Sequence, residues 1–152
     1  MQVLFLGDSI TDAGRDRSDC HLLGPGYPGY TVRALEEKLS PEQFREIEFL
    51  NWGISGFRAG NVLDQWNGRK DEADPDIVTL MIGINDVWRK FDNNDPTPPE
   101  LYEQRLTSLM EALTAKKRAK VIIIEPITLS AAGWICLMFR KERIRTNACA
   151  TK

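Results

Sequence analysis

The chain has 152 residues, a length typical of one compact domain. Its residues are 42% hydrophobic, 28% charged and 9% aromatic, which excludes a collagen-like, disulfide-scaffold or wholly disordered protein. The formal net charge of −2 provides no basic field for sequence-independent phosphate binding. Nucleic acid is therefore not an expected partner.

The charge is unevenly distributed along the chain. Residues 134–152 contain five basic residues and one acidic residue, so a basic segment follows an acidic body. The longest wholly apolar run, residues 134–139, is far shorter than the ~20 residues needed to cross a bilayer. Residues 1–6 lead directly into Gly7-Asp8-Ser9 without a signal-peptide pattern. These features predict a cytoplasmic protein that does not bind membranes.

Four short apolar runs predict the strands of a parallel sheet. The runs are nearly continuous rather than alternating, as expected for strands that are covered by helices on both faces. They occupy residues 2–6, 47–51, 77–82 and 121–124.

Helical patterns occupy the intervals between these strands. Residues 30–39 and 59–66 each carry an apolar stripe at helical spacing. A third helix is predicted to start with Thr97 as its capping residue, Pro98 at the first helical position and Glu100 completing a capping box. This helix continues to about residue 117. Strands that alternate with helices predict right-handed βαβ units, and therefore an α/β fold with a parallel sheet.

The residues that follow the predicted strands are candidates for a reaction site, because reacting groups collect at the carboxyl ends of parallel strands. Ser9 follows the first strand, Gly53 the second and Asn85 the third. Each is also a common turn or capping residue when taken singly. Together they supply the parts of an acyl-transfer site. The Ser9 hydroxyl is the expected nucleophile, and the N–H groups of Ser9 and Gly53 and the Asn85 side chain are the expected donors to the oxyanion.

Three sequence blocks resemble the SGNH hydrolase superfamily, also called the GDSL esterases and lipases. The blocks are Gly7-Asp8-Ser9, Asn51-x-Gly53-x-x-Gly56 and Gly83-x-Asn85-Asp86. The resemblance implies a three-layer α/β/α, flavodoxin-like sandwich with Ser9 as nucleophile and Ser9, Gly53 and Asn85 as the oxyanion hole. It also implies a small-molecule ester substrate, with a small acyl group, a lipid or an acetylated sugar, and no cofactor or metal.

The resemblance is incomplete at its C-terminal end. The family's last block is Asp-x-x-His, whose histidine is the general base, and it has no match in this chain. The family region is predicted to cover residues 1–128, and residues 129–152 are predicted to form a disordered basic tail. A serine without a base is a poor nucleophile, so low or absent activity is expected.

Three alternatives remain open at this stage. One is a non-catalytic domain that binds acylated sugars or small esters in the same crevice. Another concerns His21, the single histidine, which is either a substitute base folded over the site or a solvent-exposed loop residue. The third concerns Trp88, which either lines an acyl or sugar pocket or packs in the core.

Asp12 and Asp86 are interpreted as caps or turn formers rather than as acids in the reaction. The oligomeric state is not predicted.

Overall fold

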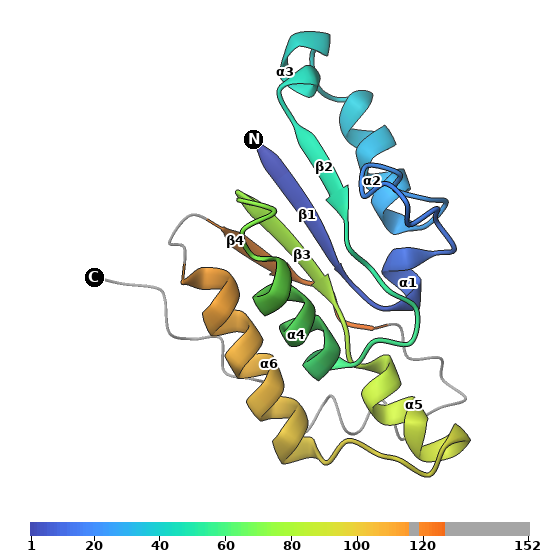
Figure 1. The fold of residues 1–152 in the computed structure, drawn as a ribbon. Helices are drawn as coiled ribbons and strands as arrows, with labels where there is room; N and C mark the ends of the chain where they lie inside the picture. Colours follow the sequence, from blue (N-terminus) through green and yellow to red (C-terminus); the bar gives the residue numbers. More distant parts are fainter. Residues whose placement is uncertain (116–118, 127–152) are drawn as a thin grey trace.

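The computed structural model describes residues 1–115 and 119–126. Within them a parallel sheet has the strand order β2-β1-β3-β4 (Figure 1). This is the order of the flavodoxin-like fold up to its fourth strand. The strands are β1 (Gln2–Gly7), β2 (Glu48–Asn51), β3 (Ile77–Met81) and β4 (Lys120–Ile123).

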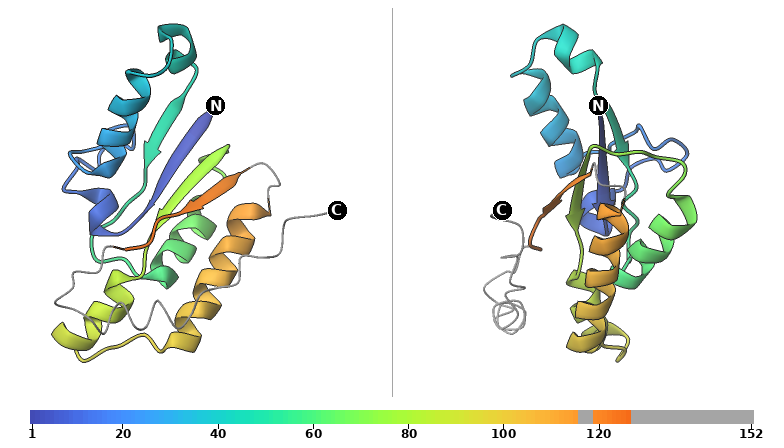
Figure 2. Two further views of the ribbon diagram at one scale, coloured as in Figure 1. Left: turned by 180° about the vertical axis from the view of Figure 1, so that it is seen from behind. Right: turned by 90° about the vertical axis from the view of Figure 1, so that its left-hand side faces the viewer.

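Helices cover both faces of the sheet, and α2 and α4 lie on opposite sides of it (Figure 2). None of the helices within the described residues is both long enough and apolar enough to span a membrane. In chain order they are α1 (Ser9–Asp12), α2 (Tyr27–Glu36), α3 (Pro41–Arg45), α4 (Ala59–Arg69), α5 (Ile84–Asp92) and α6 (Pro99–Thr114).

Alternate residues of β1 face the two helical layers, because successive side chains of a strand point to opposite faces. Leu4 and Leu6 are buried in a core that contains residues of α4 and α6. Val3 and Phe5 are buried in a second core against residues of α2 and of the segment around α3. The predicted three-layer α/β/α architecture with a parallel sheet is therefore confirmed for the part of the chain that the structure describes.

The four strands and the three longer predicted helices are present, with small shifts of their ends. The predicted capping box of α6 is wrong: Pro98 is the capping position and Thr97 lies outside the helix, with its N–H donating to the Asp86 carbonyl at 3.2 Å. The sequence interpretation missed α1, α3 and α5. The predicted family boundary at residue 128 and the tail of residues 129–152 lie outside the described residues.

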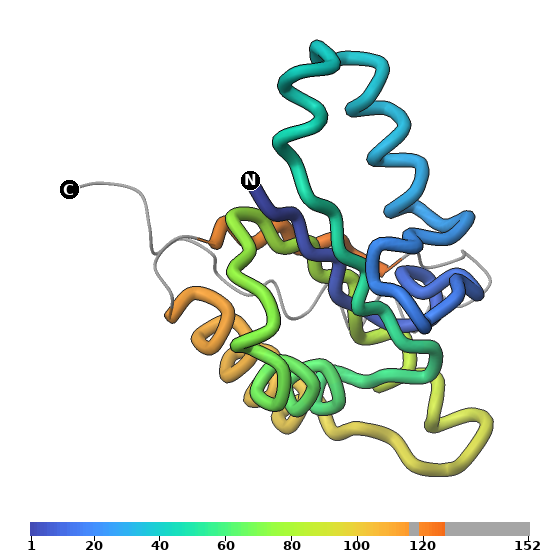
Figure 3. The backbone as a smooth tube through the Cα atoms, turned by 45° about the horizontal axis from the view of Figure 1, so that its top comes forward, coloured from blue at the N-terminus to red at the C-terminus, as the bar shows by residue number. Residues whose placement is uncertain are grey.

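The connection between α5 and α6 projects away from the sheet (Figure 3). All strands end at one edge, where α1, α5 and the first turn of α4 meet (Figure 1). The edge therefore gathers the loops that carry the candidate site residues.

Truncation of the sheet core provides a test of this packing. Leu80 in β3 is fully buried, so Leu80→Ala is expected to lower the free energy of unfolding by about 2–5 kcal/mol. Leu22→Ala removes an exposed side chain and serves as the control, with a change within about 0.5 kcal/mol. Urea unfolding followed by circular dichroism measures both. Equal effects of the two variants would contradict the burial described for β3.

Candidate active site

Ser9 lies two residues after β1, as the first residue of α1, and is exposed to solvent. Asp8 caps this short helix: its carboxylate accepts the Ile10 N–H at 3.0 Å. The Ser9 N–H belongs to the first helical turn, which has no intrahelical acceptor. The structure therefore places a serine hydroxyl and its own N–H at the carboxyl edge of the central strand.

Gly53 follows β2 and lies directly beneath α1. Its N–H donates to Asn51 Oδ1 at 2.9 Å, within a buried turn. A Cβ at Gly53 would lie 2.6 Å from the Asp12 backbone nitrogen, so only glycine fits against this helix. Close packing thus explains why residue 53 is a glycine, and its N–H already has an acceptor.

Asn51 holds this arrangement together from a fully buried position. Its Nδ2 donates to the Thr11 and Leu23 carbonyls, both at 2.9 Å, while its Oδ1 accepts the Gly53 N–H. One side chain thereby connects β2 with α1 and with the loop before α2. Because buried polar groups are costly when unpaired, these bonds favour a single conformation of the edge.

Asn85 lies in the first turn of α5, after β3. Its Nδ2 donates to the Phe57 carbonyl at 2.9 Å. A carboxamide nitrogen carries two hydrogens, so a second donor remains for a ligand. The structure thus brings Asn85 to the segment that follows β2, and specifically to its end at Gly56 and Phe57.

Gly56 is a functional candidate that the sequence interpretation did not single out. Its φ of +87° favours glycine. Among the described residues no backbone hydrogen bond engages its N–H. The neighbouring Ser55 N–H donates to Asp12 Oδ2 at 3.2 Å, which ties this turn to α1. Gly56 is the second glycine of the Asn51-x-Gly53-x-x-Gly56 block, so the sequence contains it. The hydrogen bond that occupies the Gly53 N–H is seen only in the structure.

Buried carboxylates surround this edge and differ in their electrostatics. The Arg17 guanidinium, hydrogen-bonded to Asp12, lowers the pKa of that carboxyl. Burial raises the pKa of Asp8, and the charge of Asp86 raises it further. Burial likewise raises the pKa of Asp86, whose Oδ2 accepts the Ala59 N–H at 3.0 Å. Asp86 therefore joins the start of α5 to the start of α4, where it accepts an N–H of the first helical turn, as a capping carboxylate does.

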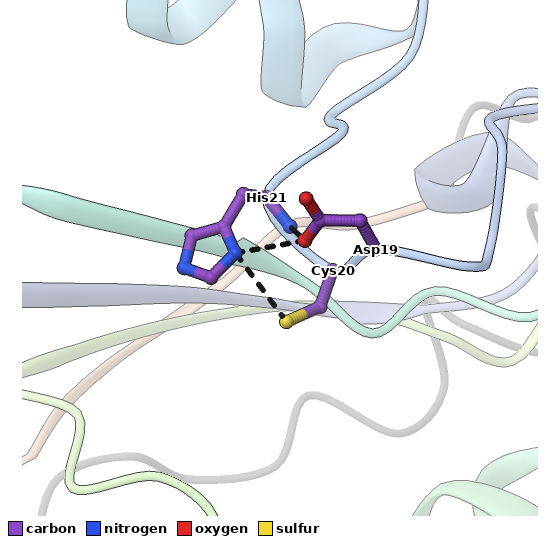
Figure 4. Close-up of side chains that lie close together, drawn as sticks. All are labelled: Asp19, Cys20 and His21. Carbon is purple, nitrogen blue, oxygen red and sulfur yellow. Dashed lines mark hydrogen bonds and ion pairs between the residues drawn. The ribbon is translucent and has the colours of Figure 1, made fainter.

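His21 does not contact the candidate site. Its Nδ1 lies 2.8 Å from Asp19 Oδ1, as Figure 4 shows, and its Nε2 lies 3.1 Å from Glu48 Oε1. Glu48 is the first residue of β2 and pairs with Gln2, at the opposite edge of the sheet from Ser9. The hydrogen bonds to Asp19 and Glu48 raise the pKa of His21. This geometry favours the loop-histidine interpretation over the substitute base.

The loop of His21 also contains a small group of metal-ligand atoms. Side-chain atoms of Asp19, Cys20 and His21 lie within 4.8 Å of one another (Figure 4). The three residues are consecutive, and Asp19 and His21 are exposed and bonded to each other. In the described part of the chain, the side-chain contacts of His21 are with Asp19, Cys20 and Glu48 rather than with Ser9, so we assign the group no part in the candidate reaction.

The fold and this edge define a class: a parallel α/β/α protein with an exposed serine and an asparagine amide at the carboxyl ends of neighbouring strands. The model of the GDSL-like lipase/acylhydrolase family matches residues 5–148. The chain belongs to this family. The match extends past residue 128, and the predicted end of the family region there remains a prediction.

Known proteins with similar sequences and structures support the assignment of the chain to this family. An acetylxylan esterase of Geobacillus stearothermophilus is 38% identical over 131 residues, which cover 81% of this chain and 58% of that protein. A solved catalytic mutant of Axe2, an acetylxylan esterase from the same organism, has a histidine replaced by alanine. It has a TM-score of 0.75 and 34% identity, covering 91% of this chain and 67% of the other.

Two further structures are similar. A second catalytic mutant of the same esterase has a serine replaced by alanine, with a TM-score of 0.69 and 33% identity over 91% of this chain and 67% of the other. An α/β hydrolase enzyme from the metagenome of Lake Arreo has a TM-score of 0.67 and 34% identity, covering 80% of this chain and 58% of the other. This chain thus spans 58% of the length of the curated relative.

The packing of Gly53 leads to a stability prediction. Gly53→Ala forces a Cβ against backbone and Thr11, so it is expected to lower the free energy of unfolding by about 1–3 kcal/mol. Gly68→Ala is the matched control, because nothing lies within 4 Å of a Cβ at that helical position. Chemical denaturation measures both variants. A Gly53→Ala protein as stable as the parent would argue against the close contact with α1.

The two carboxylates around His21 lead to a pH prediction. Because they stabilise the imidazolium, the His21 pKa is expected to lie above the reference value of 6.5. Its NMR signals are unambiguous, since the chain has one histidine. Glu48→Gln should lower this pKa, whereas Glu37→Gln, an exposed change near the end of α2, should leave it unchanged. A midpoint at or below 6.5 in the parent protein would refute the paired geometry.

Proposed function

We propose that this chain is an esterase that removes small acyl groups, such as acetyl, from sugars through an acyl-enzyme on Ser9. The observation that carries the proposal is the exposed Ser9 at the end of β1, on the edge where the Asn85 amide meets the turn at Gly56. The acetylxylan esterase relative supports the choice of an acetylated sugar as substrate.

In the proposed reaction, the Ser9 Oγ attacks the ester carbonyl carbon and loses its proton. The carbonyl oxygen becomes an oxyanion, which accepts hydrogen bonds from the Ser9 N–H and Asn85 Nδ2. Collapse of this intermediate expels the sugar alcohol and leaves an acyl-serine. Water then attacks the acyl-serine, releases the carboxylic acid and returns the serine hydroxyl.

The third oxyanion donor is a glycine N–H of the segment after β2. Gly53 fills this role only if its N–H exchanges Asn51 Oδ1 for the oxyanion. Gly56 needs no such exchange, and it immediately precedes Phe57, whose carbonyl accepts from Asn85. The geometry therefore favours Gly56 as the donor.

Loss of the Ser9 proton is the slow step expected of this chain. Both ring nitrogens of His21 face carboxylates at the other edge of the sheet, so this histidine does not accept the proton. With no other base assigned in the described part of the chain, water or hydroxide takes the proton, and the expected rate enhancement is about 10³–10⁴-fold over water, from the oxyanion donors and binding alone.

Exposed aromatic rings beside Asn85 are compatible with a sugar substrate. Trp88 is 50% exposed on α5 and makes an edge contact with Phe91, at 6.4 Å between ring centroids. This exposure excludes the core-packing interpretation of Trp88. Apolar ring faces pack against the C–H faces of sugars, which supports a role for the pair in holding the alcohol part of the ester.

The engagement of His21 also supports a second candidate function. A domain that keeps the oxyanion donors but lacks an available base would bind an acylated sugar without turning it over. Turnover that depends on Ser9 distinguishes the two functions.

Replacement of the nucleophile tests the esterase proposal. The parent chain is expected to hydrolyse 4-nitrophenyl acetate and acetylated xylo-oligosaccharides slowly, with a rate that increases with pH, and to form an acyl adduct on Ser9 visible by mass spectrometry. Ser9→Ala should abolish the adduct and reduce the rate to that of buffer, because alanine has no hydroxyl to form the acyl bond.

Ser18→Ala, an exposed loop serine, is the control and should retain full activity. Hydrolysis by the Ser9→Ala protein at the parent rate would overturn the proposal. Saturable binding of the acetylated sugar by a parent chain that shows neither adduct nor turnover would select the binding domain instead.

A further inference from the structure

We infer that the pocket between α4, α5 and α6 binds a carboxylate group of the substrate. The pocket has a volume of about 510 Å³, enough for one sugar ring and its substituent. Three arginines from separate elements line it: Arg58 precedes α4, Arg89 lies in α5 and Arg105 in α6. This inference rests on the proposed function and specifies the chemistry of its substrate.

Two glycines provide room for these guanidinium groups. A Cβ at Gly60 would lie 3.0 Å from Arg105 Nε, so the missing side chain lets this guanidinium lie against the first turn of α4. A Cβ at Gly56 would lie 3.4 Å from Arg89 Nη2, so Arg89 covers the turn proposed to donate to the oxyanion. The pocket therefore adjoins the acyl site and is accessible to another part of the same substrate.

The lining has many hydrogen-bond donors and few acceptors. Each guanidinium carries five N–H donors and no acceptor. The side-chain oxygen Oδ1 of Asn61 accepts the backbone N–H of Arg58 at 3.0 Å, which leaves the side-chain amide hydrogens of Asn61 for a ligand. Asp64 is the one carboxylate in the lining. An acceptor-rich ligand satisfies such a surface, and a carboxylate matches the planar fork of arginine.

Arg105 is the pocket arginine without an ion pair in the described part of the chain, and its charge interacts at longer range with the buried Asp86 carboxylate. Arg58 pairs with Asp95 at 2.6 Å, and Arg89 pairs with Asp92, both through surface-accessible carboxylates. Within residues 1–115 and 119–126, Arg105 has no carboxylate oxygen within 4.0 Å. A substrate carboxylate would supply the missing partner. Paired guanidiniums retain further N–H donors for the same group.

The carboxylate has two possible sources in an ester substrate. It belongs to a uronate on the sugar side or to a dicarboxylic half-ester on the acyl side. The chemistry of recognition is the same in both cases, and matched acidic and neutral ligands distinguish them.

Binding to the full chain tests the inference independently of turnover. The ligands are xylotriose with and without one glucuronate substituent, and monomethyl succinate against dimethyl succinate, each titrated by amide NMR shifts. The acidic member of at least one pair is expected to bind about tenfold tighter or more, because its hydrogen bonds are charge-assisted. The pair that shows the preference identifies the source.

Arg105→Gln should remove this preference, and Gly60→Ala should weaken it by displacing the guanidinium without altering charge. Arg33→Gln, an exposed arginine on α2 across the sheet, should preserve it. An unchanged spectrum outside the pocket confirms that each variant is folded.

Equal binding of acidic and neutral ligands would overturn the inference, as would a preference that survives Arg105→Gln in a folded protein. Either result leaves the esterase proposal standing if the neutral sugar binds and Ser9 forms its adduct. Failure of the adduct with an intact acidic preference would reject the esterase proposal alone, and the pocket would remain a carboxylate site.

Discussion

The parallel pairing of β1 with both β2 and β3 is the constraint on which the rest of the structure depends. Val3 of β1 pairs with Phe49 of β2 and with Ile77 of β3, so all three strands run the same way and end together. The chain after β2 continues beside β1, where the Ile54 N–H donates to the Gly7 carbonyl at 3.1 Å. Ser9, the segment from Gly53 to Gly56, and Asn85 are thereby forced to one edge, although they are dispersed over more than half of the chain.

Buried polar contacts add to hydrophobic packing in stabilising that edge. Asp12 accepts the Ser55 N–H and Asp86 accepts the Ala59 N–H, each from a segment distant in the sequence. Asn51 accepts the Gly53 N–H within its own turn and donates to the carbonyls of Thr11 and Leu23. A buried acceptor that loses its donor costs about 1–3 kcal/mol, so such contacts select one arrangement strongly. They also explain why so many polar residues of the sequence blocks are not reactive groups: most of them hold the loops that present Ser9 and Asn85.

The sequence could predict the strands and helices that depend on a local pattern of residues. Continuous apolar runs identified the strands, because helices on both faces leave no position for polar residues. It did not predict α1, whose four residues are too few to show a helical period. The sequence does carry an apolar stripe for α5, at Ile84, Val87, Trp88 and Phe91, which the interpretation missed. The sequence could not assign the glycine donor, since the choice between Gly53 and Gly56 follows from the single bond to Asn51 Oδ1. His21 was equally ambiguous, because its position depends on Glu48, a partner 27 residues away.

Chemistry and substrate selection are carried by different parts of the fold. The proposed nucleophile and oxyanion donors follow β1, β2 and β3, so their positions depend on the register of the sheet. The arginine-lined pocket depends on the packing of α4 against α6, and on two glycines that leave space for guanidinium groups. The turn at Gly56 belongs to both, because it lies beside Asn85 through Phe57 and beneath Arg89. A substrate carboxylate bound by Arg105 and Arg89 would therefore fix the orientation of the ester relative to this turn. Binding of this distant group would then affect the reaction only by positioning the ester.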